Sequence, residues 1–129
     1  MIDKRAIAEI LSILLPPEAE VEYDFNRDEF FASFCWLLHS DPKRPFKRSK
    51  RVNFVVTPEA LSDFENVGNK NEARLQMNLE MYINHKLDEF NPEHDAPEGY
   101  PEPTEDWKID SMLFIEALES VKGVRRRLF

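Results

Sequence analysis

Three stretches in the first half of the chain show the two-residue periodicity of β-strands, and they constrain the fold more than any other feature. They are EVEYDF (20–25), EFFASFCWLLHS (29–40) and RVNFVVT (51–57). In such patterns alternate side chains enter the core. The inward set in the first and third stretches would be Val21, Tyr23, Phe25, Val52, Phe54 and Val56. Because a turn at 26–28 joins the first two stretches and a loop joins the second to the third, we expect an antiparallel sheet of three strands or slightly more.

The middle stretch has two interpretations. As a strand it would place Phe30, Ala32, Phe34, Trp36 and Leu38 on one face; as a helix, Phe30, Phe31, Phe34, Leu37 and Leu38 would share a face. We favour a strand over 29–39, because aromatic residues are common in strands and a partner strand lies close by.

Helical patterns flank these strands. A first helix over 3–14, with Asp3 as its N-cap, is predicted by Ile7, Ile10, Leu11 and Leu14, and it must stop at Pro16-Pro17. Thr57-Pro58-Glu59 has the cap, proline and acid of a helix start, and Gly68-Asn69 interrupts that helix. A longer helix to about Phe90 has a stripe of Leu75, Leu79, Ile83, Leu87 and Phe90. A last helix is expected from Asp110 to Gly123.

These elements predict an α+β fold with one sheet and helices on one of its faces. The expected order is helix, three strands, helix, a short strand at Trp107 and Ile109, and helix. Residues 1–129 would form a single two-layer domain. Within it, 91–106 is predicted to be an acidic, proline-rich connector and 124–129 a basic C-terminal tail.

Charge is unevenly distributed along this chain, whose formal net charge is −8. Six of the nine residues in the loop 43–51 are basic, whereas 88–106 holds eight acidic residues and no basic one. The loop would join two antiparallel strands. Its charge is compatible with three interpretations: a solvated loop, a contact with an acidic protein surface, or a contact with nucleic acid phosphates.

The composition argues against several classes of protein. One cysteine rules out an intramolecular disulfide framework, and neither a secretory signal nor a membrane-spanning run of about 20 apolar residues is found. A cytoplasmic protein without membrane association is therefore expected.

Catalytic and metal motifs are also missing from the sequence. Cys35 and His39 would stand roughly 13 Å apart on a strand, too far for a catalytic dyad. His85 and Glu89, and the run Glu93-His94-Asp95, lack the further ligands of a metal site. No catalytic residue, metal or cofactor is assigned, and we expect a protein that is not an enzyme.

The predicted partner-binding residues come from the basic loop and from two aromatic residues near the connector. They are Lys43, Arg44, Phe46, Lys47, Arg48, Lys50, Arg51, Tyr100 and Trp107. Phe46 could also stack on a base, so a nucleic-acid-binding accessory protein is the alternative. The helix–strand–strand–strand–helix order is found in double-stranded RNA-binding domains too, but Glu59, Asp63 and Glu65 make the second helix acidic.

The predicted order of elements and the acidity resemble type III secretion chaperones, small acidic dimers that bind unfolded effector segments. That resemblance implies a non-enzymatic protein-binding module that could be a homodimer. An acidic immunity or inhibitor protein that neutralises a basic toxin has the same features. The primary expectation is thus binding of a protein partner whose identity the sequence does not give.

Overall fold

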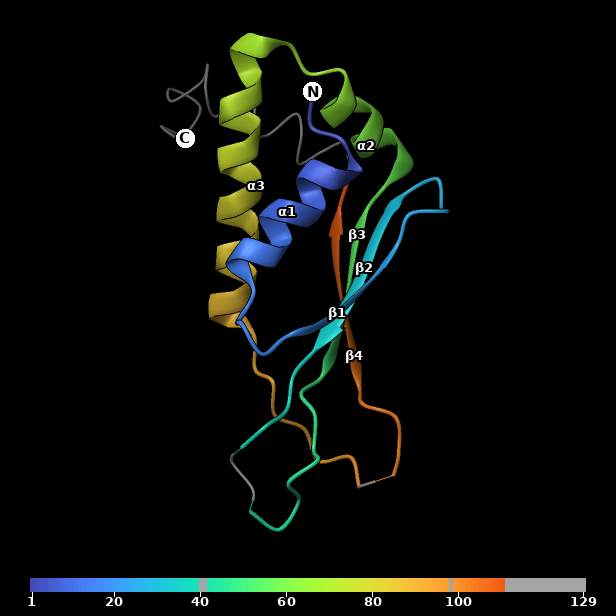
Figure 1. The fold of residues 1–129 in the computed structure, drawn as a ribbon, viewed down its shortest axis with the longest axis vertical. Helices are drawn as coiled ribbons and strands as arrows, with labels where there is room; N and C mark the ends of the chain where they lie inside the picture. Colours follow the sequence, from blue (N-terminus) through green and yellow to red (C-terminus); the bar gives the residue numbers. More distant parts are fainter. Residues whose placement is uncertain (40–41, 98, 111–129) are drawn as a thin grey trace, which may run out of the picture.

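The computed structural model describes residues 1–39, 42–97 and 99–110, and it has a four-stranded sheet with three helices (Figure 1). The elements are α1 (Lys4–Leu14), β1 (Glu20–Asp24), β2 (Phe30–Cys35), β3 (Arg51–Val56), α2 (Pro58–Glu65), α3 (Asn69–Glu89) and β4 (Thr104–Ile109). The α+β class, the single sheet and the order of elements agree with the sequence prediction. The predicted last helix and the tail 124–129 lie outside the described residues.

The sheet has the strand order β1-β2-β3-β4 and mixed directions. The two hairpins β1–β2 and β2–β3 are antiparallel, as predicted, with Val21 opposite Phe34 and Ala32 opposite Phe54. The fourth strand differs, because β4 runs parallel to β3. A parallel neighbour requires a crossover, and α2, α3 and the segment 90–103 form it by returning the chain to the end where β3 began. The fully antiparallel arrangement is therefore corrected to a mixed sheet.

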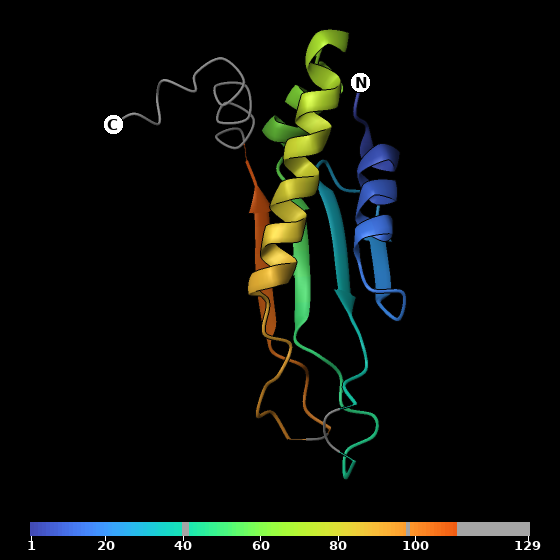
Figure 2. The same ribbon diagram turned by 90° about the vertical axis from the view of Figure 1, so that its left-hand side faces the viewer.

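Helices α1 and α3 lie together on one face of the sheet (Figure 2). Residues from both layers fill the core between them, among them Leu11 of α1, Phe34 and Phe54 of the sheet, and Leu79 and Ile83 of α3, all buried. Burial of apolar area of this kind is the main force that holds the two layers together. These two helices thus cover the same face of the sheet, in agreement with the predicted two-layer arrangement.

Local sequence signals place most element boundaries. The Asp3 side chain accepts a hydrogen bond from the Ala6 N–H, and Thr57 caps α2 through the Ala60 N–H, with Pro58 at the first helical position. Both caps were predicted, and both helices begin directly after them. The interruption predicted at Gly68-Asn69 separates α2 from α3.

The ambiguous stretch 29–39 is a strand, but a shorter one than predicted. Phe30, Ala32 and Phe34 face the core, and β2 ends at Cys35. Beyond it, Leu37 and Arg48 form an isolated antiparallel bridge that leads into the basic loop. Phe25 was expected to point inward; it follows the end of β1, is 48% exposed and stacks on the Tyr23 ring.

No helix in the described part of the chain has both the length and the apolar character needed to cross a membrane. The longest, α3, buries Leu75, Leu79 and Ile83, whereas Met77 and Met81 are about 60% exposed.

Candidate functional site

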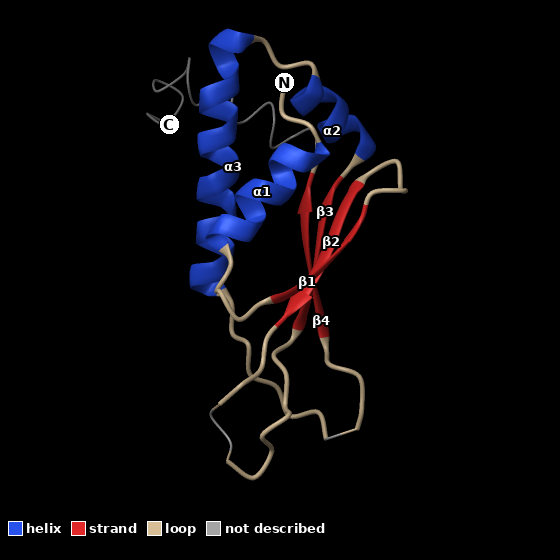
Figure 3. Cartoon of the chain, viewed as in Figure 1, coloured by secondary structure: helices blue, strands red, loops and turns tan. Residues whose placement is uncertain are grey.

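Two loops extend beyond the same end of the sheet, and between them they contain most of the predicted partner-binding residues (Figure 3). One is the β2–β3 connection, 36–50, which includes most of the basic loop. The other is 90–103, the segment that leads from α3 into β4. They lie side by side because β3 and β4 are neighbours and both begin at this end.

The base of the β2–β3 connection is an ordered continuation of the hairpin. The Leu38 N–H donates to the Lys47 carbonyl at 2.8 Å, and the Ser49 N–H donates to the Trp36 carbonyl at 2.7 Å. The fully buried Ser49 hydroxyl accepts from the Trp36 N–H and donates to the Lys50 carbonyl. The Ser49 hydroxyl therefore has both a donor and an acceptor partner, as a buried polar group requires. The basic loop is consequently held by a defined stem.

The end of the acidic segment is built into the sheet. Thr104, Glu105 and Asp106, its last three residues, belong to β4. Its carbonyl groups pair with the start of β3: the Lys50 N–H donates to the Pro92 carbonyl at 3.0 Å, and the Arg51 N–H donates to the Pro103 carbonyl at 2.9 Å. Proline lacks an N–H donor but keeps its carbonyl acceptor, so a proline-rich segment can still accept hydrogen bonds from the neighbouring backbone.

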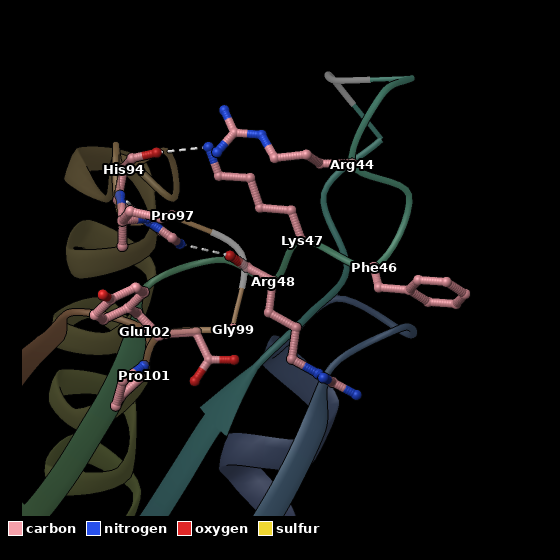
Figure 4. Close-up of a pocket in the computed structure, with 11 residues that line it drawn as sticks. Arg44, Phe46, Lys47, Arg48, His94, Pro97, Gly99, Pro101 and Glu102 are labelled. Carbon is pink, nitrogen blue, oxygen red and sulfur yellow. Dashed lines mark hydrogen bonds between the residues drawn. The ribbon is translucent and has the colours of Figure 1, made fainter.

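His94 is the residue that joins the two loops. Its Nε2 donates to the Arg48 carbonyl at 2.8 Å, and its Nδ1 accepts from the Ala96 N–H at 3.2 Å. The Lys47 ammonium donates to the His94 backbone carbonyl at 2.5 Å (Figure 4). This pair of ring contacts selects the neutral tautomer with its proton on Nε2, because Nδ1 must present a lone pair to the amide.

A pocket with a volume of about 410 Å³ opens between the loops. The basic loop lines it with Arg44, Phe46, Lys47 and Arg48, and the second loop with His94, Ala96, Pro97, Gly99, Tyr100, Pro101 and Glu102. Its two aromatic residues are unusually accessible: Phe46 is 74% exposed and Tyr100 is 69% exposed. In Figure 4 Arg44 and Lys47 extend toward His94, whereas the Phe46 ring points away from that segment.

The loop cations are only partly available to a partner. The Arg48 guanidinium leaves the pocket to pair with Glu20 of β1 at 3.2 Å, and its hydrogen bond to that carboxylate raises the pKa of Arg48. Arg51 lies on the sheet, where its guanidinium donates to the Ser33 hydroxyl and to the Cys35 sulfur. The basic loop is therefore more than a solvated turn, since parts of it are tied to β1, to the sheet face and to the second loop.

Most of the predicted partner-binding residues are brought together, with clear exceptions. Arg44, Phe46, Lys47, Arg48 and Tyr100 line the pocket, whereas Lys43, Lys50 and Arg51 do not. Whether the basic tail joins the loop in one patch is a question about residues outside the described ones.

Trp107 was predicted as a contact residue, and this prediction is wrong. Its side chain is 1% exposed, and it packs edge-to-face against Phe34 and Phe90. The reason is that β4 is an integral strand whose inward position falls on Trp107, between exposed Asp106 and Lys108.

The sequence analysis missed His94 and its neighbours Pro97, Pro101 and Glu102 as site residues. A signal was present, because the +6 formal charge of 42–58 and the −8 of 88–106 favour close approach of these two segments. Opposite charge predicts that these two segments lie close together, but it does not predict which side chains line a pocket.

The other candidate chemical groups lie apart from this pocket. Cys35 is fully buried beneath Arg51, and burial raises the pKa of its thiol. His85 pairs with Glu89 one helical turn away, and both side chains are more than half exposed. Over residues 1–39, 42–97 and 99–110, the His, Cys, Asp and Glu side chains form no cluster of three or more suited to a metal ion.

Comparison of the chain with protein-family models, with curated proteins and with solved structures found no match in any of the three.

Proposed function

We propose that the protein is a non-enzymatic interaction module that binds another protein through the pocket between the two loops. The observation that carries this proposal is the pair of accessible aromatic residues, Phe46 and Tyr100, beside the cations Arg44 and Lys47 in one concave site. Tyrosine, phenylalanine and arginine are enriched at protein interfaces, and concave sites on loops held by a rigid scaffold are common binding surfaces.

The way the site is built supports this reading. The described parts of its two loops are held by β3, β4 and the His94 contacts, which favours binding with little rearrangement of these parts. The protein would act in the cytoplasm as an adaptor, a chaperone-like or an inhibitor-like module. The single cysteine, buried in the sheet, agrees with a reducing compartment.

Affinity capture tests the proposal. Tagged wild-type protein is incubated with nuclease-treated lysate, in parallel with the double variant Phe46→Ala/Tyr100→Ala. The control is Met77→Ala/Met81→Ala, which removes two side chains of similar exposure from α3, away from the pocket. We expect a discrete partner that the wild type and the methionine variant retain and the aromatic variant loses. Equal capture by all three proteins would contradict the pocket as the binding site.

A nucleic-acid-binding accessory role for the loop 43–51 is the second candidate. It is favoured by Phe46, whose exposed ring points away from the acidic segment and could stack on a base. Binding of a labelled oligo(dT) at several salt concentrations tests it. A slope that falls by about one for each phosphate-contacting lysine or arginine replaced would favour this role. Absence of binding at low salt would exclude single-stranded DNA as the ligand.

A further inference from the structure

We infer that the pocket between the two loops recognises an extended peptide segment in which a carboxylate sits next to an apolar side chain. This inference rests on the proposed protein-binding function and adds the chemistry of the partner. Three features of the pocket support it: the charge of the lining, the apolar wall, and the acidic groups around the pocket.

The described lining is positive although the protein is acidic. Arg44, Lys47 and Arg48 contribute three positive charges and Glu102 contributes one negative charge, which leaves a formal +2 with His94 neutral. The Arg48 guanidinium is directed to Glu20, whereas Arg44 and Lys47 extend across the pocket toward His94. A lysine ammonium has three donors, and the bond to the His94 carbonyl uses one of them. Both groups form strong, charge-assisted hydrogen bonds with carboxylates.

The second loop supplies an apolar wall of the pocket. Ala96, Pro97, Tyr100 and Pro101 line it, and a turn closes where the Tyr100 N–H donates to the Pro97 carbonyl at 3.2 Å. Gly99 in this turn has a φ of +90°, which a residue with a side chain rarely adopts. Proline and tyrosine lose little conformational entropy on binding, so this wall suits an apolar side chain that follows or precedes the carboxylate.

The surroundings favour one carboxylate over a chain of phosphates. Glu102 lies in the lining, and seven further acidic residues occur within 88–106. A polyanion that continued beyond the pocket would meet further acidic residues of this segment, whereas a single carboxylate would face only Glu102 among the described lining residues. The volume of about 410 Å³ is near the lower end of ligand sites and suits one or two side chains.

Paired synthetic peptides test this specificity. Labelled octapeptides carry Asp or Glu next to Leu, Phe, Tyr or Trp, and each has a partner in which Asn or Gln replaces the acid. Blocked ends remove terminal charges, and a separate set ends in a free C-terminal carboxylate, which separates the two sources of this group. Oligo(dT) and inorganic phosphate serve as anion competitors. Fluorescence anisotropy gives the Kd of each probe.

Two double variants separate pocket chemistry from loop charge. Arg44→Gln/Lys47→Gln removes the two cations directed across the pocket and leaves polar, uncharged side chains in their place. Lys43→Gln/Lys50→Gln removes the same charge from the same loop at positions that do not line the pocket. Far-UV circular dichroism and the melting temperature establish that both variants fold.

We expect acidic peptides to bind at least about tenfold more tightly than their amide partners. This preference should disappear in Arg44→Gln/Lys47→Gln and persist in Lys43→Gln/Lys50→Gln. Equal affinity for acid and amide peptides, no peptide binding, or equal loss in both variants would overturn the inference. So would oligo(dT) binding that weakens equally in both variants, which would favour nucleic acid. The proposed function is judged separately, because partner capture that depends on Phe46 and Tyr100 would stand even if no carboxylate preference were found.

Discussion

Replacement of Trp107 tests whether β4 is an integral strand of the domain. The indole is 1% exposed, its ring centroid lies 5.4 Å from that of Phe34 and 5.8 Å from that of Phe90, and its Nε1 donates to Glu105 at 2.7 Å. It therefore joins β4 to β2 and to the end of α3. Were the acidic segment a loose connector ending in an exposed contact residue, the same replacement would leave stability unchanged.

The structure sets the size of the expected effect. Truncation of a buried tryptophan to alanine removes its apolar burial and leaves a cavity, so Trp107→Ala should cost about 3–5 kcal/mol of unfolding free energy. Trp107→Phe keeps an aromatic ring but loses the hydrogen bond to Glu105, and about 1–2 kcal/mol is expected. Small domains have about 5–15 kcal/mol in total, so the alanine variant should lie near the limit of folding.

Urea denaturation followed by far-UV circular dichroism measures these differences. Trp36, the only other tryptophan, supplies an independent fluorescence signal in both variants. Tyr100→Ala is the matched control, because this aromatic residue is 69% exposed and should change the unfolding free energy by no more than about 0.5 kcal/mol. If Trp107→Phe and Trp107→Ala both fell within that same range, the packing of Trp107 against Phe34 of β2 and Phe90 at the end of α3 would be refuted. If the alanine variant does not fold, the phenylalanine variant still decides the matter.

Three further predictions concern single side chains. His94→Phe removes the hydrogen bonds to Arg48 and Ala96, so hydrogen exchange at the Ala96 amide and proteolysis within 91–103 should both accelerate, with a loss of about 1–2 kcal/mol in unfolding free energy. Burial raises the pKa of Cys35 in the folded state, so the unfolded chain releases this proton first as the pH rises. The contribution of the buried thiol to stability is complete below the ordinary cysteine pKa, about 8.5, and declines as the pH rises above it, so Cys35→Ala should show a flatter decline above that pH in urea titrations. Glu20→Gln breaks the exposed pair with Arg48 and should change the unfolding free energy by no more than about 0.5 kcal/mol, a value that a larger measured loss would contradict.

Sequence patterns predicted most of the secondary structure because the information is local. Alternation over 51–57 depends only on neighbouring residues, as do the caps at Asp3 and Thr57, and all three predictions are confirmed. The middle strand was predicted correctly from its aromatic residues and its nearby partner, although it ends at Cys35, earlier than expected.

The site was predicted less completely, because a pocket depends on residues far apart in the chain. Phe46 and Tyr100 were chosen for their residue types, and the fold places both in one lining with Arg44. Trp107 was chosen for the same reason, yet it lies in the core. The residue type alone could not distinguish a core position from a contact position, since large aromatic residues are common both in cores and at contact surfaces.

The sequence alone predicts the α+β class, the three antiparallel strands, the extent of α1, the start of α2 and the separation of a basic loop from an acidic segment. The parallel pairing of β4 with β3 and the contact of His94 with the backbone of Arg48 emerge from the three-dimensional fold alone. The physical reason is the range of the interactions involved. Periodicity and capping act over a few residues, whereas strand order and the approach of two loops depend on how α2 and α3 return the chain across the sheet.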